Sequence, residues 1–250
     1  MKKGSITYTL NNGVARLQFT HPSSNAFPSS LLKELIKNIQ DLDTNPDVSV
    51  IILESGGTKA FCAGASFDEL LAINTPEEGT AFFSGFANLL NAMRTCSKLI
   101  IGRVQGKAVG GGVGIIAACD YCFATEQASV KLSELSIGIG PFVIAPAIER
   151  KIGVSALSDL TLKGTWHTAN WAKEKGLFTE IFPNISTVDK AVNLFAKELV
   201  SYNISALSEM KKVMWQNTSH WEKLLIERAA ISGKLVLSET TKQTLKKFKN

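Results

Sequence analysis

Residues 105–120, QGKAVGGGVGIIAACD, contain the stretch that decides the fold: three consecutive glycines, Gly110 to Gly112, between two apolar runs. Each glycine loses a large backbone entropy on folding. The triple lies between a strand-like run at 99–104 and a helix-like run at 112–119, so we expect bare backbone N–H groups there. The start of a helix adds a partial positive charge. Together these features predict a site for an oxygen that carries or develops negative charge.

A second glycine-bearing segment, KAFCAGAS at 59–66, follows a strand-like run at 48–54 and precedes an apolar, acidic helix start at 67–71. Neighbouring strand-to-helix junctions of a parallel sheet face the same crevice. Two interpretations stay open at this point. Either one N–H group from each junction clamps a single oxygen, or the small residues only allow close packing of helix on sheet.

The periodicity of the rest of the chain predicts an α/β core followed by a helical C-terminal region. Residues 5–10 and 14–20 indicate a hairpin, Pro28 opens a helix, and a long helix is expected over 76–97. Strand patterns at 48–53, 99–104 and 120–125 alternate with helices, which favours a largely parallel sheet. The loop expected at 56–64 carries no strand, and no strand is expected after residue 141. Helical patterns there cover 142–151, 154–163, 168–175, 187–202, 204–216, 219–231 and 238–248.

The composition is that of an ordinary globular protein. The 250 residues are 45% hydrophobic and 20% charged, which is enough for one large domain or for a core with a small appendage. The N-terminus lacks the apolar core of a signal peptide, so a cytoplasmic location is expected. The four cysteines are expected to be reduced core thiols. Cys119 and Cys122 form a C-x-x-C without a second pair, so no metal site is predicted.

Common catalytic signatures are missing from the sequence. The glycines at 110–114 do not have dinucleotide-binding spacing, and neither a phosphate-binding P-loop nor a G-x-S-x-G motif is present. The net charge of +5 owes part of its excess to the lysines at 242–249. They form either a solvated helix end or a contact to phosphates, such as those of a nucleotide or coenzyme A.

Four segments together resemble one known family. FCAGAS at 61–66 and GGGVG at 110–114, with HPSSNAF at 21–27 and SELSIGIGPFVIAP at 133–146, are similar to the crotonase superfamily, the enoyl-CoA hydratase/isomerase family. The resemblance implies a crotonase-like (ClpP/crotonase) α/β spiral of ββα units with a helical C-terminal region. It also implies an acyl-CoA site in a core at 1–195 and a trimerisation region at 196–250, in a homotrimer or hexamer.

The same resemblance implies which residues act. The backbone N–H groups of Ala65 and Gly111 would hold the thioester oxygen of an acyl-CoA substrate. Coenzyme A would pass Ala63, Gly64, Ser66 and Phe67, with Lys59 as a candidate contact to phosphate. Coenzyme A is part of the substrate, so no separate cofactor is expected. Neither a membrane nor a nucleic acid is expected as a partner.

The family's acid/base glutamates are the least conventional part of the site. One corresponds to Glu134, but Gly114 stands at the position of the other, and Ser66 stands where many members have aspartate. A single base suits Δ3–Δ2 isomerisation, whereas the segment from Glu134 to Pro146 resembles the bacterial methylglutaconyl-CoA hydratase-like branch. Hydration of an α,β-unsaturated acyl-CoA is therefore predicted, with isomerisation as the alternative.

Three further expectations complete the prediction. The bulk of Phe142 would limit the acyl chain, and Lys246, Lys247, Phe248 and Lys249 are candidate contacts to CoA phosphates. The resemblance also points to fatty acid metabolism or branched-chain amino acid catabolism.

The rival class of function is a non-catalytic acyl-CoA-binding or RNA-binding protein. Glu134 together with both glycine segments favours the enzyme, since a pure binder needs no base.

Overall fold

The computed structural model describes residues 3–249 and opens on a β-hairpin. β1 (Ser5–Asn11) pairs antiparallel with β2 (Val14–Thr20). Between them Asn12 and Gly13 have positive φ angles of 48° and 79°. Positive φ at both central residues is typical of a type I′ turn, and the predicted hairpin is confirmed.

Six strands form the larger sheet, in the order β1-β2-β3-β5-β7-β10. From β2 onward every neighbouring pair is parallel, as the alternation of strands and helices predicts. The strands after the hairpin are β3 (Val50–Ser55), β5 (Leu99–Val104), β7 (Tyr121–Thr125) and β10 (Glu180–Phe182).

A smaller sheet has the order β4-β6-β8-β9. Its strands are β4 (Ala60–Cys62), β6 (Lys107–Val109), β8 (Ser129–Lys131) and β9 (His167–Thr168). After β3, β5 and β7 the chain adds one short strand here and then turns into a helix, which repeats a ββα unit. Against the sequence expectation, β4 lies inside the predicted loop at 56–64, and β9 and β10 follow residue 141. Strands of two or three residues are too short to show an alternating pattern.

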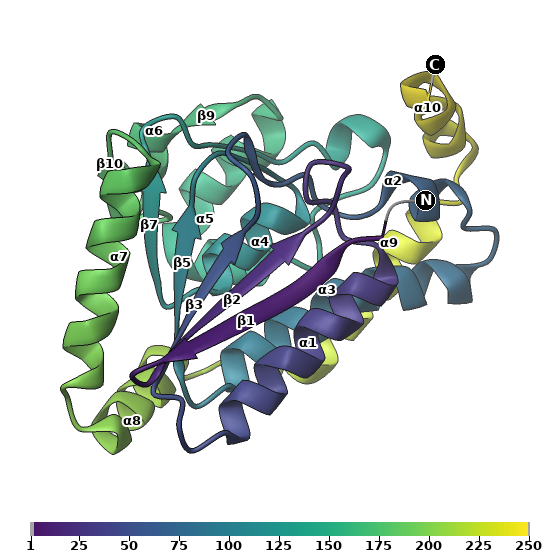
Figure 1. The fold of residues 1–250 in the computed structure, drawn as a ribbon. Coiled ribbons are helices and arrows are strands. Elements are labelled where there is room, and N and C mark those ends of the chain that lie inside the picture. The colour runs from purple at the N-terminus through teal and green to yellow at the C-terminus, as the bar shows by residue number, and fades with distance from the viewer. Residues whose placement is uncertain (1–2, 250) are drawn as a thin grey trace.

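Helices cover both faces of the larger sheet (Figure 1). α1 (Ser29–Thr44) and α3 (Pro76–Thr95) pack on one face and α7 (Ile185–Val200) on the other. Within β3, Ile51 and Leu53 point into the first core, whereas Val50 and Ile52 point toward α7. A strand buried on both faces needs apolar residues throughout, which explains the uninterrupted run of the sequence.

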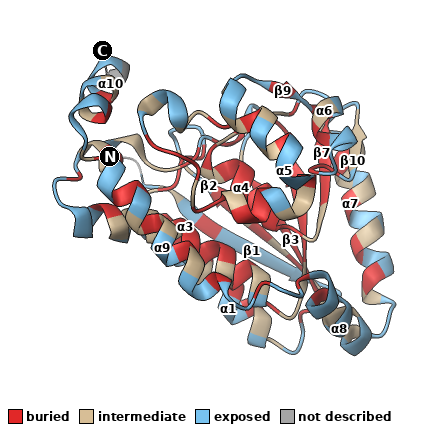
Figure 2. Ribbon diagram, turned by 180° about the vertical axis from the view of Figure 1, so that it is seen from behind, coloured by how far each residue is buried: buried red, intermediate tan, exposed pale blue. Residues whose placement is uncertain are grey.

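α4 (Gly111–Ala118) lies in the middle of the molecule, and every residue after Gly111 is buried (Figure 2). It is the helix that the triple glycine introduces. The short α2 (Phe67–Leu71) likewise follows the AGAS segment. Two of the predicted strand-to-helix junctions are therefore present and start helices beside the smaller sheet.

The C-terminal region is helical, as predicted. It contains α5 (Ala145–Lys163), α6 (Ala169–Glu174), α8 (Ile204–Met214), α9 (Trp221–Leu235) and α10 (Glu239–Lys249). The helices expected at 142–151 and 154–163 are both present within α5, separated by a kink at Gly153, where φ is 74° and the backbone is not helical. α7 continues across residue 195, the expected end of the core. α8 is anchored by Lys211, whose ammonium lies 2.9 Å from the buried carboxylate of Asp120.

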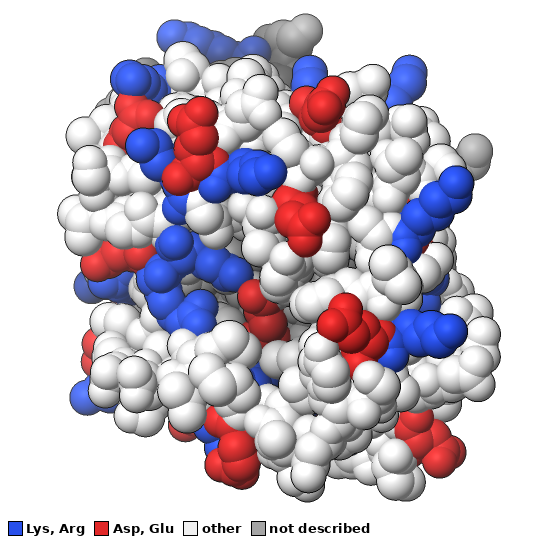
Figure 3. All heavy atoms as spheres, turned by 90° about the vertical axis from the view of Figure 1, so that its left-hand side faces the viewer, with Lys and Arg blue, Asp and Glu red and all other residues white. Residues whose placement is uncertain are grey.

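Two surface properties bear on partners. Across residues 3–249, no helix is both long enough and apolar enough to cross a bilayer. On the face that α7 covers, the Lys and Arg side chains are interspersed with Asp and Glu (Figure 3).

Candidate active site

The two glycine-bearing segments lie against each other. A Cβ built on Gly64 would stand 3.6 Å from the backbone N of Gly111 and 3.0 Å from the carbonyl oxygen of Val109. Their strands, β4 and β6, are parallel neighbours in the smaller sheet. Both segments thus leave the same edge of that sheet, as expected for junctions facing one crevice.

Close packing accounts for two glycines of the triple. A Cβ on Gly111 would lie 2.2 Å from the ring of Phe86, and one on Gly112 would lie 2.7 Å from Cβ of Cys62. Side chains at these positions would overlap their neighbours. The packing interpretation of the small residues is therefore correct at these two positions.

The Ala65 N–H group is nevertheless bare. On one side of it the Gly64 N–H contacts Cys62 Sγ at 3.3 Å, and on the other the Ser66 N–H donates to the carbonyl of Phe27 at 2.9 Å. Ala65 N–H donates to no described residue. A bare N–H between two bonded ones is a fixed donor that an outside oxygen can use.

Gly111 supplies a second bare donor. The N–H of Gly110 donates to the carbonyl of Lys131 at 3.0 Å, and the Gly110 carbonyl accepts from Val113 N–H at 2.8 Å. Gly111 N–H donates to no described residue, and it is the first residue of α4. The partial positive charge of a helix N-terminus strengthens such a donor toward a negative oxygen. Packing and oxyanion binding are thus compatible uses of the same glycines.

The segment at 21–27 holds the Ala65 donor in place. The N–H of Phe27 donates to the carbonyl of Gly64 at 2.8 Å. The side-chain amide of Asn25 donates to two carbonyls of the stretch at 56–60, at 2.8 and 2.9 Å. The HPSSNAF motif therefore acts as a clamp on the loop that presents Ala65.

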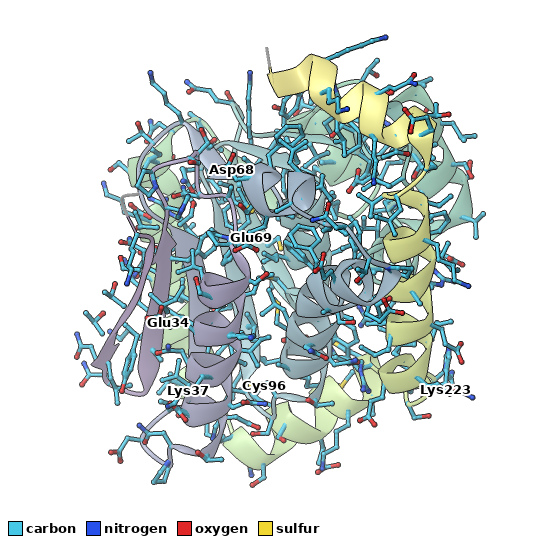
Figure 4. The ribbon with its side chains drawn as sticks, turned by 90° about the vertical axis from the view of Figure 1, so that its right-hand side faces the viewer. Glu34, Lys37, Asp68, Glu69, Cys96 and Lys223 are labelled. Carbon is cyan, nitrogen blue, oxygen red and sulfur yellow. The ribbon has the colours of Figure 1, made fainter. Side chains whose placement is uncertain are left out.

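Ser66 has a structural role at the start of α2. Its hydroxyl accepts from the Glu69 N–H at 3.4 Å, which makes it the N-cap of that helix. Glu69 in turn accepts from the N–H and hydroxyl of Ser29 at the start of α1, at 2.8 and 2.6 Å (Figure 4). Serine and aspartate are both favoured N-caps, so the serine at this position keeps the helix start that an aspartate would give.

Glu134 follows β8 and points its carboxyl group at the triple glycine. A Cβ on Gly110, whose φ is 54°, would lie 2.8 Å from Glu134 Oε1, so only glycine fits there. Oε2 is inaccessible to solvent and has no hydrogen-bond partner among the described residues. Burial raises the pKa of Glu134 to about 7, against hydrogen bonds from the backbone of Glu134 and Ser133 that lower it. A carboxyl group that titrates near neutrality is suited to general acid/base catalysis.

These groups share one cavity of about 400 Å³. One part of its wall is polar and comes mainly from the end of β8 and the segment after it, with Lys131, Ser133, Glu134 and Ser136. The remainder is largely apolar. The predicted residues that line the cavity are Ala63, Gly64, Ala65, Phe67, Gly111 and Glu134.

Ile144 occupies the space beside Gly114. A Cβ on Gly114 would lie 2.5 Å from Ile144 Cγ2 and 2.8 Å from Ile144 Cβ. Both residues are buried, and Ile144 lines the cavity. A glutamate at position 114 would not fit this packing, because the apolar side chain of Ile144 occupies the space.

Comparison with known proteins agrees with this geometry. The family model described as enoyl-CoA hydratase/isomerase matches residues 9–249. The chain belongs to the enoyl-CoA hydratase/isomerase family. Its structure superposes on an enoyl-CoA hydratase from Bacillus halodurans with a TM-score of 0.90 at 20% identity, over 97% of this chain and 99% of that one. That likeness confirms the crotonase fold.

Relatives within the enoyl-CoA hydratase/isomerase family include both reaction types. The chain is 29% identical to the peroxisomal Delta(3,5)-Delta(2,4)-dienoyl-CoA isomerase of Arabidopsis thaliana, over 84% of this chain and 80% of the relative. It is 28% identical to the 2,3-dehydroadipyl-CoA hydratase of Escherichia coli (strain K12), over 85% and 78%. Family membership therefore indicates an enzyme of the lyase or isomerase type and is consistent with an acyl-CoA thioester as substrate.

Other predicted residues lie outside the cavity wall. Ser66 and the exposed Lys59 do not line it, and Lys246 and Lys247 are exposed on α10. The side chains of Phe248 and Lys249 lie outside the described residues. Phe142 does not line the cavity although its neighbours Pro141 and Val143 do.

Some lining residues were not predicted as part of the site. Phe82 and Phe86 belong to an apolar stripe with helical spacing, which indicates core and nothing more. Trp166 and Ser232 lie in segments without any motif, far along the chain from the glycines. Only the fold brings them to the cavity.

Proposed function

We propose that this enzyme hydrates α,β-unsaturated acyl-CoA thioesters through a thioester enolate. The observation that carries the proposal is the position of the Glu134 carboxyl group against Gly110, next to the bare Gly111 N–H. The Cα atom of a thioester whose oxygen binds these donors would lie close to the Glu134 carboxyl group. Coenzyme A is part of the substrate, and the mechanism uses no separate cofactor.

The two bare donors stabilise the intermediate. Ala65 N–H and Gly111 N–H bind the thioester oxygen and hold it more strongly as it becomes an enolate oxygen. Preorganised donors of this type contribute about 3–4 kcal/mol each to transition-state stabilisation. Ala63 and Gly64, on the same segment as Ala65, would lie along the adenine of coenzyme A, and Phe67 would contact the same molecule.

Glu134 serves as base and acid in turn. Its carboxylate takes a proton from water while the water oxygen bonds to Cβ, and the π electrons move to the thioester oxygen. The new Glu134 carboxylic acid then returns the proton to Cα as the enolate collapses. Water is added across the double bond and Glu134 is regenerated, so one carboxyl group suffices.

The polar part of the wall supports hydration over isomerisation. Ser133 and Ser136 flank Glu134 in the cavity lining, and the Ser136 hydroxyl donates to the Ser133 carbonyl at 2.6 Å. The Ser136 oxygen keeps its lone pairs free to accept a hydrogen bond from a water molecule in the cavity. This arrangement supplies a hydrogen-bond acceptor for the water, which a second glutamate would otherwise supply.

Isomerisation from Δ3 to Δ2 is the second candidate. The observation that favours it is the Ile144 side chain packed on Gly114, which leaves the cavity with one carboxylate among its described lining residues. Isomerisation needs only one base, which removes a proton at C2 and returns it at C4.

For the acyl group we propose a branched or carboxylate-bearing chain of the methylglutaconyl type. Lys131 is the one cationic side chain among the described residues that line the cavity. An acyl carboxylate paired with Lys131 would avoid the cost of a buried, unpaired charge. Lys131→Met should then lower kcat/KM for 3-methylglutaconyl-CoA and leave that for crotonyl-CoA unchanged; an equal loss for both would refute the pairing.

The family resemblance further suggests a homotrimer or hexamer assembled through residues 196–250. Light scattering coupled to size exclusion tests this directly. A monomer at the concentrations used for assay would refute it.

A paired assay in deuterated water tests the reaction. Crotonyl-CoA, 3-methylglutaconyl-CoA and 3-hexenoyl-CoA are offered separately, and products are analysed by mass spectrometry after return to ordinary water. Hydration predicts a product that gains the elements of water and one carbon-bound deuterium. Conversion of only the 3-enoyl substrate, without gain of water, would establish the isomerase instead.

A further inference from the structure

The cavity has a second wall where α3 and α9 come into backbone contact. A Cβ on Gly79 of α3 would lie 2.7 Å from the Cα of Gly233 on α9. Figure 4 shows the two helices side by side. Because the backbones touch, the residue before Gly233, Ser232, has no freedom to move away from α3. Phe82 and Phe83, about one turn beyond Gly79, line the cavity together with Ser232.

The hydroxyl group of Ser232 is buried without a partner. Ser232 is 1% exposed, and its Oγ makes no hydrogen bond to any described residue. Serine within a helix commonly donates to the carbonyl four residues earlier, and Ser232 does not. Leaving a buried hydroxyl unpaired costs about 1–3 kcal/mol. A helix interior would be more stable with alanine here, unless something that enters the cavity bonds to the hydroxyl.

The surroundings of Ser232 limit what that group can be. On α2, α3 and the loop after Glu134 the lining residues are apolar and form one cluster with Val236, which caps the same helix as Ser232: Leu70, Phe82, Phe83 and Ile139. The two charged lining residues come from the end of β8, Lys131, and from the segment just after it, Glu134. A carboxylate bound only by a hydroxyl on an apolar wall would be a poorly compensated buried charge. An uncharged oxygen meets no such penalty.

We propose that Ser232 is a specificity-determining residue that hydrogen-bonds an uncharged oxygen substituent on the acyl chain, a hydroxyl or carbonyl. This inference rests on the proposed function, since it takes the occupant of the cavity to be an acyl-CoA. The thioester end of the chain contacts Ala65 and Gly111. The oxygen substituent reaches the wall formed by α3 and α9.

The experiment compares pairs of 2-enoyl-CoA substrates of graded chain length, each made with a terminal methyl group and with a terminal hydroxyl group. We measure kcat/KM for the wild type, Ser232→Ala and Thr161→Val, and Kd for the matching saturated acyl-CoA compounds by calorimetry. Thr161 is the matched control, because its buried Oγ1 also lacks a partner but does not line the cavity.

At one chain length the wild type should prefer the hydroxylated substrate by about tenfold, the effect of one well-placed hydrogen bond. Ser232→Ala should lose that preference and keep its activity on the methyl-ended chain, and Thr161→Val should match the wild type. Equal use of both chain types at every length, or a preference that survives Ser232→Ala, would overturn this inference while the proposed function stands. Failure to bind or turn over any acyl-CoA would overturn the proposed function and this inference with it.

Discussion

Replacing Glu134 by glutamine tests the catalytic base in two independent ways. The substitution keeps the size of the side chain and removes its ability to take a proton. If Glu134 is the only base, kcat/KM should fall by about 10²–10⁴-fold, the usual contribution of general acid/base catalysis. The exposed Glu126→Gln is the matched control and should retain wild-type turnover.

The pH dependence follows from the burial of the carboxyl group. Glu134 must be ionised to act as base, and burial raises its pKa from 4.5 to about 7. Wild-type kcat/KM should therefore rise with pH through about pH 7 and level off above it. An inflection near pH 4.5, the ordinary value, would refute the buried position of the carboxyl group.

Stability gives a readout that does not involve catalysis. The unfolded chain ionises at the ordinary pKa of 4.5 and the folded chain only at about 7. Between these values the unfolded state loses its proton first, so folding stability falls as pH rises and is constant above. The penalty at pH 8 is about 3 kcal/mol, at 1.36 kcal/mol for each pKa unit.

Glu134→Gln removes this penalty. Urea unfolding should show the variant more stable than the wild type at pH 8 and equally stable near pH 4. Near-native turnover by Glu134→Gln would remove Glu134 from the mechanism. Equal free energies of unfolding for the variant and the wild type at pH 8 would show that the pKa of Glu134 is not raised.

Three further outcomes follow from the packing around the site. The Phe86→Ala substitution makes room for a side chain at position 111. In that background Gly111→Pro should be about 10²–10³-fold less active than Gly111→Ala, because only proline lacks the N–H donor. Equal steady-state activity of the two variants would refute the oxyanion role. Gly114→Ala should destabilise the fold by about 1–3 kcal/mol through overlap with Cγ2 and Cβ of Ile144. Adding Ile144→Gly, which removes both atoms, should cost less than the two single changes together; additive free energies of unfolding would disprove that contact. Lys211→Met should lower the free energy of unfolding by about 3–5 kcal/mol, because the carboxylate of Asp120 stays buried without Lys211 as its counter-charge. Turnover by the folded protein should be unchanged. A loss below 1 kcal/mol would show that the pair does not anchor α8.

The sequence predicted the large elements of the fold because their signals are local. The turn at Asn12 and Gly13 needs positive φ, and β3 is an uninterrupted apolar run. The short strands of the smaller sheet escaped prediction, since three residues show no period and depend on neighbours distant in the sequence. The break between the helices predicted at 142–151 and 154–163 is local too, because Gly153 has a positive φ and such a glycine usually ends a helix.

The site was predictable where glycine is required and unpredictable where only the fold brings residues together. The triple glycine and the segment at 59–66 were identified from their small side chains and their places after strands, and the family resemblance singled out Gly111 and Ala65 within them. Ser232 reaches the cavity through the crossing of two helices, and no pattern near it in the sequence indicates a ligand. Ile144 explains Gly114 only once the packing between α4 and α5 is known.

In the proposed mechanism Glu134 moves the proton at Cα, and the two bare N–H groups stabilise the thioester enolate that results. Exchange of the Cα hydrogens of a saturated acyl-CoA, such as butyryl-CoA, in deuterated water tests this step alone, because the substrate can be neither hydrated nor isomerised. The account predicts deuterium at Cα, detected by mass spectrometry, with the wild type and none above background with Glu134→Gln. Exchange that is equally fast in both proteins, or absent from a wild type that binds the thioester, would contradict it.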